Sequence, residues 1–238
     1  MRYTAEMRRF ARTLGGVLIV VGVLALAWVV LVWRWQDPVT ALYTHWKQHQ
    51  LAQSVDRQFA AYRPVPLKRD DLAAERRTIA ADAARFRRDA ARGQAIGRIA
   101  IGRIGLHMVL VNGTDHESLK RGPGRDLRSF MPGQNRLVYI AGHRTTYLAP
   151  FSHIDAIRRG DAIRIEMPYA TFLYRAVGHR IVAATDLSVL RSPKHEQLEL
   201  QACHPRFFAT HRYIVYARLA TVLPRGGAPY RIASAAQQ

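Results

Sequence analysis

From Gly93 onward, the chain is divided into short runs of apolar and β-branched residues separated by glycine, proline and aspartate. Runs of this kind, bounded by turn residues such as Asn112-Gly113 and Pro132-Gly133, are typical of strands in a sandwich or a barrel. The expected strands are Gly97–Ile101, His107–Val111, Arg136–Ala141, Ala162–Met167, Thr171–Arg180, Leu198–Ala202 and Arg212–Leu219. A chain of 238 residues is long enough for one domain with accessory segments. We therefore expect one all-β domain, folded as a partly closed β-barrel.

The N-terminal segment has a different character. Residues Leu14–Trp33 form an uncharged run of 20 residues, which is about the length that crosses a bilayer as a helix. Four arginines precede the run, so the positive-inside rule places residues 1–13 in the cytoplasm and the remainder outside. A cleavable signal peptide is the rival interpretation, because Ala25-Leu26-Ala27 resembles a cleavage site. The apolar run continues past that site, which favours a retained transmembrane helix at residues 14–33.

Residues 34–94 are expected to form an extracytoplasmic helical stalk or linker. Asp37-Pro38 interrupts the first helix, and Val39–Tyr62 is typical of a second helix. Asp70–Arg92 places several apolar residues near one face and predicts an amphipathic helix. This last helix is either a spacer, a helix lying against the next domain, or a solvated linker, and the sequence does not separate the three.

The chain carries a formal net charge of +19. A strongly basic balance often indicates nucleic acid or an anionic surface. The arginines are scattered, however, and no nucleic-acid motif accompanies them, so no nucleic-acid partner is expected. Anionic lipid headgroups or cell-wall polymers are the better candidates for an exported chain, and solubility with a codon bias toward Arg and Ala is the alternative.

Three chemically capable side chains stand where expected strands meet loops. Cys203 ends one run, Arg212 opens the next, and His143 follows the run that begins at Arg136. Since Cys203 is the only cysteine, it cannot form an internal disulfide, and in an exported domain it is either a small buried residue or a reactive thiol. A nearby cation stabilises a thiolate, so Arg212 and His143 favour the reactive alternative.

Together His143, Cys203 and Arg212 resemble the catalytic triad of the sortases, the membrane-anchored cysteine transpeptidases of Gram-positive surfaces. The stretch Gly142–Phe151, which reads GHRTTYLAPF, is most similar to the class E type. The resemblance extends over roughly residues 96–223. It implies an eight-stranded β-barrel catalytic domain at residues 95–224, followed by a C-terminal tail at residues 225–238.

The resemblance also implies a reaction and a location. Cys203 attacks a Leu-Pro-x-Thr-Gly-like or Leu-Ala-x-Thr-Gly-like sorting signal between Thr and Gly, His143 protonates the leaving amine, and Arg212 stabilises negative charge. The acyl group then passes to an amine of a peptidoglycan precursor or a pilin. The expected partners are surface proteins bearing the signal, and the expected location is the cell membrane, with the catalytic domain outside.

Some positions depart from the family pattern. The residue before the nucleophile is usually threonine in the family, but here it is Ala202, which removes a hydroxyl near the oxyanion. The candidate substrate contacts are Thr145, Thr146, Tyr147, Ala202 and His204, of which the three that follow His143 are equally compatible with an ordinary hydrogen-bonded loop. No cofactor is expected, and the remaining histidines lack the clustered spacing of a zinc site, so no metal is expected.

Other functions stay open on the sequence alone. The change to Ala202 is compatible with a catalytically weakened, sortase-like module that binds extended peptides in the cell envelope. A membrane-tethered scaffold is a further alternative. An L,D-type crosslinking transpeptidase is disfavoured, because the chain lacks a Ser-x-Gly-Cys signature.

Overall fold

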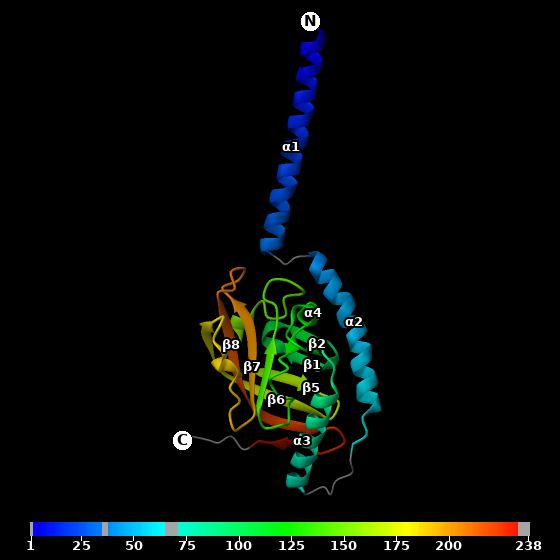
Figure 1. Ribbon diagram of the computed structural model, residues 1–238, viewed down its shortest axis with the longest axis vertical. Helices are drawn as coiled ribbons and strands as arrows, with labels where there is room; N and C mark the ends of the chain where they lie inside the picture. Colours follow the sequence, from blue (N-terminus) through cyan, green and yellow to red (C-terminus); the bar gives the residue numbers. More distant parts are fainter. Residues whose placement is uncertain (1, 35–37, 65–70, 233–238) are drawn as a thin grey trace.

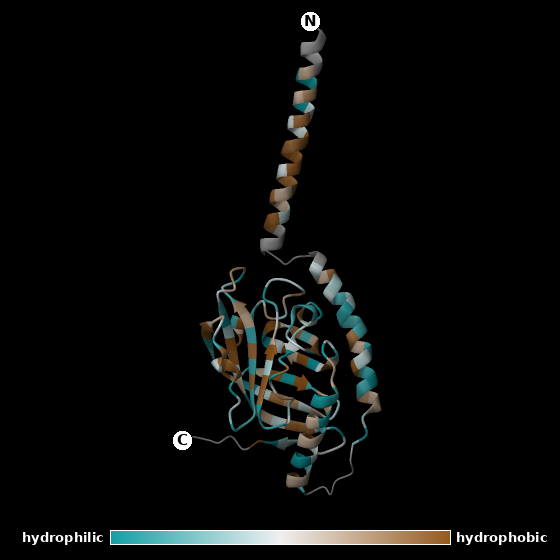
Figure 2. Cartoon of the chain, viewed as in Figure 1, coloured by the Kyte–Doolittle hydropathy of each residue, from teal (hydrophilic) through white to brown (hydrophobic). Residues whose placement is uncertain are grey.

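The computed structural model describes residues 2–34, 38–64 and 71–232. Helix α1 (Arg2–Arg34) is a single long helix that projects from the remainder of the chain (Figure 1). Its segment Met7–Val30 is long and apolar enough to cross a membrane, and no part of it is buried against the protein. The hydropathy colouring shows brown, hydrophobic residues along much of this helix in the view drawn (Figure 2). A helix that is apolar on all sides and unpacked is compatible with a membrane span.

Within the described residues, one sheet closes on itself as a barrel. The hydrogen-bonded order is β6-β5-β1-β2-β3-β4-β7-β8, and the pairing of β6 with β8 completes the ring. Short β9 pairs with β8 outside the ring. The strands are β1 Ala95–Ile101, β2 Leu106–Asn112, β3 Gly124–Arg125, β4 Leu137–Ala141, β5 Ala162–Glu166, β6 Ala170–Ala183, β7 Gln197–His204, β8 His211–Pro224 and β9 Tyr230–Arg231. The expected eight-stranded barrel is therefore confirmed.

Short helical turns connect the strands. These are η1 (Gly102–Ile104), α4 (His116–Leu119), η2 (Ile154–Ala156) and η3 (Leu187–Leu190). All seven strands expected from the sequence are present, with ends that differ by a few residues. The eighth strand of the ring, β3, has only two residues, and so short a strand has no alternating pattern by which to predict it.

Side-chain alternation divides each strand between the barrel interior and an outer face. On β7, Leu198, Leu200 and Ala202 belong to the main core. Residues 197, 199, 201 and 203 therefore face outward, because successive strand residues point to opposite sides of a sheet. A second apolar cluster covers part of the outer face, formed by Leu137, Tyr139, Val182, Val189 and Ile214.

Helices α2 (Pro38–Ala61) and α3 (Leu72–Asp89) lie against the barrel rather than standing free of it (Figure 1). On α2, Thr44 and Val55 are fully buried. The side chain of Gln48 accepts from the N–H of Val109 at 2.7 Å and donates to the carbonyl of the same residue at 3.1 Å. Of the alternatives for residues 70–92, the structure shows the helix packed on the domain, with Ile79 in the main core.

Candidate active site

Cys203 and Arg212 face each other across neighbouring strands. They are register partners in the antiparallel pair formed by β7 and β8. Both residues occupy outward-facing positions on their strands, because their neighbours Ala202 and Tyr213 belong to the interior core. Directly opposed residues in such a pair have Cβ atoms about 5 Å apart, so the thiol and the base of the guanidinium side chain are neighbours.

His143 reaches the same place from the other side of β7. Strand β4 runs parallel to β7, with Ala141 opposite Gln201. The N–H of Gly142 continues the ladder and donates to the carbonyl of Gln201 at 3.0 Å. Because parallel strands bring their carboxyl ends to the same edge, His143 follows β4 just where Cys203 stands near the end of β7. The topology therefore brings His143, Cys203 and Arg212 to one edge of the barrel.

The loop after His143 is closed and tightly packed. Phe151 is fully buried, and its N–H donates to the carbonyl of His143 at 3.0 Å. A Cβ atom at Gly142 would lie 2.6 Å from the Phe151 ring, so only glycine fits there. Three consecutive residues, Tyr147, Leu148 and Ala149, have left-handed backbone angles with φ of 53°, 61° and 38°. Such conformations cost energy in residues other than glycine and are frequent at functional sites.

Tyr147 lies against the candidate catalytic histidine. The ring centroids of Tyr147 and His143 are 5.1 Å apart at an interplanar angle of 40°. The backbone N–H of Tyr147 donates to Oγ1 of Thr40 on α2 at 3.1 Å. Thr145 and Thr146 are half-buried in the same loop. Helix α2 therefore supports the loop that packs beside His143.

The environment of His143 favours its neutral form. Its Nε2 atom is buried and has no hydrogen-bond partner within the part of the chain that the structure describes. Burial, followed by the nearby His116, lowers the pKa of His143 below its ordinary value. A neutral imidazole at neutral pH can act as a base, and its protonated form can act as an acid.

Arg212 is held by one of its terminal nitrogens. Nη1 donates to the carbonyl of Ala209 at 2.8 Å and to that of His211 at 3.0 Å. Among the described residues, Nε and Nη2 make no hydrogen bond, so they can serve a ligand. Cys203 beside it is half-buried and is a free thiol. The arrangement offers a nucleophile, a titratable imidazole and a fixed cation at one edge of the barrel.

Arg144 connects the two sides of the candidate site. Its side chain is 5% exposed and forms an ion pair with Asp155 at 3.0 Å. Nη1 donates to Nδ1 of His204 at 2.9 Å and to the carbonyl of Cys203 at 3.4 Å. Since an arginine can only donate, His204 must accept at Nδ1 and is neutral in this arrangement. Arg144, which directly follows His143, therefore connects the loop after β4 to Cys203 and His204 at the end of β7.

Two expected substrate contacts lie on the other face of the sheet. Ala202 is fully buried in the barrel core, so its side chain does not face the edge that holds Cys203. The ring of His204 lies near the ring of Tyr213, and the two ring centroids are 6.0 Å apart. Burial and the charge of Arg144 lower the pKa of His204. Thr145, Thr146 and Tyr147 follow Arg144 in the loop after His143. Sequence reasoning missed the contacts of Arg144 and Thr40, because neither residue type nor spacing indicates them.

No group of three or more histidine, cysteine or acidic side chains that could hold a metal ion occurs among residues 2–34, 38–64 and 71–232.

Comparison with known proteins gives a consistent result. The family model described as Sortase domain matches residues 99–220. Sortase D of Bacillus subtilis is 32% identical over 133 residues, covering 54% of this chain and 66% of that protein. Sortase SrtE1 of Streptomyces coelicolor is 30% identical over 95 residues, covering 36% of this chain and 27% of that protein. The chain thus spans less than two thirds of the length of either relative.

Solved structures of similar fold include proteins named as sortase D and as sortase E. Sortase D5 of Clostridium perfringens superposes with a TM-score of 0.58 at 24% identity, covering 73% of this chain and 98% of that one. Sortase E from Streptomyces avermitilis superposes with a TM-score of 0.51 at 28% identity, covering 56% of this chain and 93% of that one. The similarity to class E sortases that residues 142–151 predicted is confirmed by the matches to SrtE1 and to sortase E.

Proposed function

Because this chain belongs to the sortase family, we propose that it is a membrane-anchored cysteine transpeptidase. It cleaves a Leu-Pro-x-Thr-Gly-like or Leu-Ala-x-Thr-Gly-like sorting signal between Thr and Gly, and passes the protein to an amine. The observation that carries the proposal is the placement of three side chains at one barrel edge. Cys203 and Arg212 are register partners, and His143 follows the strand on the other side of β7.

The first half of the reaction forms a thioester. The Cys203 thiolate attacks the carbonyl carbon of the signal's Thr, and the free guanidinium nitrogens of Arg212 donate to the oxygen that becomes negative. The C–N bond then breaks, and the His143 imidazolium gives its proton to the departing glycine amine. The products are an acyl group on Cys203 and a free glycine-terminated fragment.

The second half transfers the acyl group. An acceptor amine from a peptidoglycan precursor or a pilin attacks the thioester, and neutral His143 takes a proton from it. The C–S bond breaks and the thiolate is restored. Because burial lowers the pKa of His143, its imidazolium is the minor form at neutral pH. The enzyme therefore depends on the fraction of molecules in which His143 is protonated while Cys203 is ionised.

The proposed location follows from the N-terminal segment. Sortases are membrane-anchored, and this chain has an N-terminal helix long and apolar enough to span a bilayer. With the four arginines before the uncharged run Leu14–Trp33 on the cytoplasmic side, the barrel lies outside the cell. Its substrates are surface proteins that carry the sorting signal.

The alternative of a weakened peptide-binding module rested on Ala202. That side chain is buried in the core, on the opposite face of β7 from Cys203. The structure therefore offers no specific support for the binding-module alternative.

The test is a cleavage and transfer assay with the full chain in detergent micelles. Fluorogenic peptides containing either signal are incubated with and without a short glycine amine, and both products are separated. We expect cleavage that needs Cys203 and a transfer product that appears only with the amine. Arg212→Lys should lower kcat/KM by about a hundredfold or more, since losing a donor to a developing oxyanion has that effect.

Arg218→Lys is the matched control, because Arg218 is exposed on the same strand. Equal losses in the two lysine variants, or cleavage that persists in Cys203→Ala, would contradict the proposal.

A further inference from the structure

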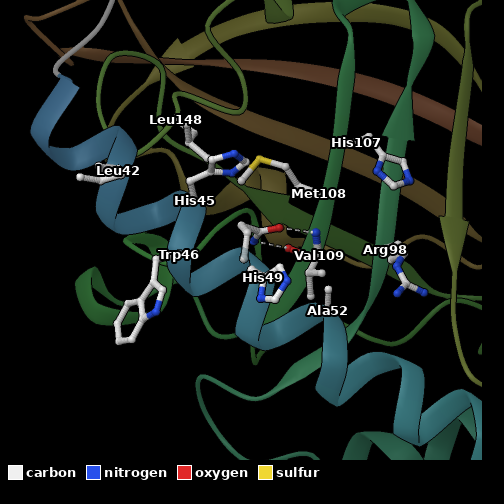
Figure 3. Close-up of a pocket in the computed structure, with 11 residues that line it drawn as sticks. Leu42, His45, Trp46, His49, Ala52, Arg98, His107, Met108, Val109 and Leu148 are labelled. Carbon is white, nitrogen blue, oxygen red and sulfur yellow. Dashed lines mark hydrogen bonds between the residues drawn. The ribbon is translucent and has the colours of Figure 1, made fainter.

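The first turns of α2 expose an unusual set of large side chains. Leu42 is 74% exposed, Trp46 is 55% exposed and Tyr43 is 38% exposed. Positions 42 and 46 are four residues apart and Tyr43 is adjacent, so the three share one side of the helix. Figure 3 shows Leu42 and Trp46 projecting from α2 while the barrel strands lie on its other side. We refer to Leu42, Tyr43, Trp46 and Lys47 as the α2 face.

The α2 face is cationic as well as apolar. The Nζ atom of Lys47 lies 4.2 Å from the Trp46 ring centroid and 5.9 Å from that of Tyr43. The segment from Pro38 to Val55 contains no aspartate or glutamate. Exposed aromatic side chains combined with a lysine on an amphipathic stem are typical of the membrane interface.

An apolar groove adjoins this face, between α2 and β2. Its volume is about 670 Å³, and Leu42 and Trp46 form part of its lining. Met108, Val109 and Leu148 line it from the barrel side (Figure 3). None of its lining residues is acidic; its ionisable side chains are His45, His49, His107 and Arg98. Arg98 is paired with Asp56 of α2 at 2.7 Å, so the unpaired positive charge on this side is that of Lys47, beside the apolar groove.

The connection to α1 places this face near the bilayer. Helix α1 ends at Arg34 and α2 begins at Pro38. Four residues span at most about 14 Å, and Trp46 lies roughly 12 Å further along the axis of α2. The polar layer of a bilayer is about 5–8 Å thick on each side. A tilt of α2 therefore brings the α2 face to this layer without stretching the connection.

We propose that the α2 face is a membrane-docking surface whose occupant is the anionic headgroup layer of the bilayer that holds α1. The aromatic and leucine side chains insert among the headgroups, Lys47 meets their phosphates, and the groove beside them accepts acyl-chain carbons. The inference rests on the membrane anchoring proposed above and not on the thiol chemistry. Docking would also fix α2, whose Thr40 accepts from the N–H of Tyr147 beside His143.

The experiment places the full chain in lipid nanodiscs that contain anionic phospholipid. Trp28, Trp33 and Trp35 are replaced by Phe, so that Trp46 is the only tryptophan. We expect the emission of Trp46 to be blue-shifted, and to be quenched when the lipid acyl chains carry bromine. Co-migration of the chain with the nanodisc reports the anchoring separately, and peptide cleavage by the same sample reports the proposed activity.

Charge reversal tests the electrostatic part. Lys47→Glu changes the charge by two units, and each basic residue near an anionic surface contributes about 1 kcal/mol, so the ratio of docked to undocked protein should fall about thirtyfold. Bromine quenching of Trp46 should fall accordingly. Arg57→Glu is the matched control, because Arg57 is exposed on the same helix further from α1, and it should leave the quenching unchanged.

Three results would overturn the inference. The first is a solvent-exposed Trp46 emission without bromine quenching in chains that have entered the nanodisc. The second is a shielded Trp46 that bromine does not quench, which indicates cover by a second copy of the chain. The third is a chain that does not enter the nanodisc, which overturns the anchoring together with the docking.

Discussion

At the residue scale, Arg144 is the side chain that joins the two halves of the candidate site. It contacts Asp155, His204 and the carbonyl of Cys203 from the position directly after His143. A displacement of about 1 Å at a reacting group can cost about a hundredfold in rate. We therefore expect the buried guanidinium to act as a positioning residue for His143 and Cys203.

We predict that Arg144→Gln lowers kcat/KM by about tenfold to a hundredfold, because the link between the two loops is lost. Arg144→Lys should recover little of this, since one amino group cannot span Asp155 and His204 together. The pKa of His204 should rise in Arg144→Gln, because the nearby positive charge that lowers it is removed. Steady-state kinetics and a proton NMR titration of His204 measure the two effects.

Arg159→Gln serves as the control for Arg144→Gln, since Arg159 is exposed. A kcat/KM value equal to wild type in folded Arg144→Gln, or an unchanged titration of His204, would show that Arg144 has no positioning role.

A second residue-scale prediction concerns His116. This residue is the second cause, after burial, of the lowered pKa of His143. His116→Gln removes a like charge, so the pKa of His143 should rise while staying below its ordinary value. Since protonated His143 is the proposed acid and is the minor form at neutral pH, a raised pKa increases the fraction of reactive molecules, so kcat/KM at neutral pH should rise. An unchanged or lower kcat/KM in folded His116→Gln, with the pKa of His143 shown by NMR to have risen, contradicts the role assigned to His143.

The sequence identified the three candidate catalytic residues because all stand at strand ends, where a site can form. It also named Ala202 and His204 as candidate substrate contacts, which stay predictions, although their side chains lie on the face of β7 opposite to that of Cys203. Neighbours on a strand face opposite sides of the sheet, so the residues on either side of Cys203 lie away from it. The role of Arg144 depends on three contacts distant in sequence, which no local pattern encodes.

At the element scale, β7 carries a second ionisable group on its outer face. Glu199 is 2% exposed, and its Oε2 atom has no hydrogen-bond partner in the described part of the chain. Burial raises its pKa from 4.5 to about 7. The folded protein therefore prefers protonated Glu199. The stability from this preference is fully present below the unfolded-state pKa, declines as pH rises above it, and is lost once pH passes the folded-state value.

We predict that Glu199→Gln, which is neutral at every pH, becomes more stable relative to wild type between pH 4.5 and about 7. The difference in unfolding free energy should grow by about 1.4 kcal/mol per pH unit and then level off. Urea unfolding of the full chain in detergent across this range measures it. Glu117→Gln is the control, because Lys120 lowers the pKa of exposed Glu117 and no gain with rising pH is expected. A flat difference for Glu199→Gln would be incompatible with a buried carboxyl group.

Elements were predictable to different degrees. The seven longer strands have alternating or apolar runs and turn signals, and all are confirmed. Strand β3 pairs through Gly124 and Arg125 alone, so it is defined by its neighbours rather than by its sequence. The helical character of α2 was predictable from its sequence, but its packing was not, because Thr44 and Gln48 contact residues far along the chain.

At the scale of the whole molecule, closure of the barrel brings the proposed chemistry together. The pairing of β6 with β8 completes the ring. This pairing extends from Ala170 opposite Pro224 to Ala183 opposite His211. In the same ring, β7 lies between β4 and β8, which supply His143 and Arg212 to either side of Cys203. Strand order of this kind depends on pairings between distant segments, so the sequence predicted a barrel but not the order of its strands.

The most direct test of the central claim is intact-protein mass spectrometry of the full chain in detergent, after brief incubation with a Leu-Pro-x-Thr-Gly or Leu-Ala-x-Thr-Gly peptide. The account predicts a mass increase equal to the peptide up to its Thr, mapped to Cys203, with release of the glycine fragment. The adduct should disappear when a glycine amine is added and should be absent in Cys203→Ala. A folded protein whose Cys203 reacts with an alkylating reagent but forms no adduct with either peptide would contradict transpeptidation at these signals.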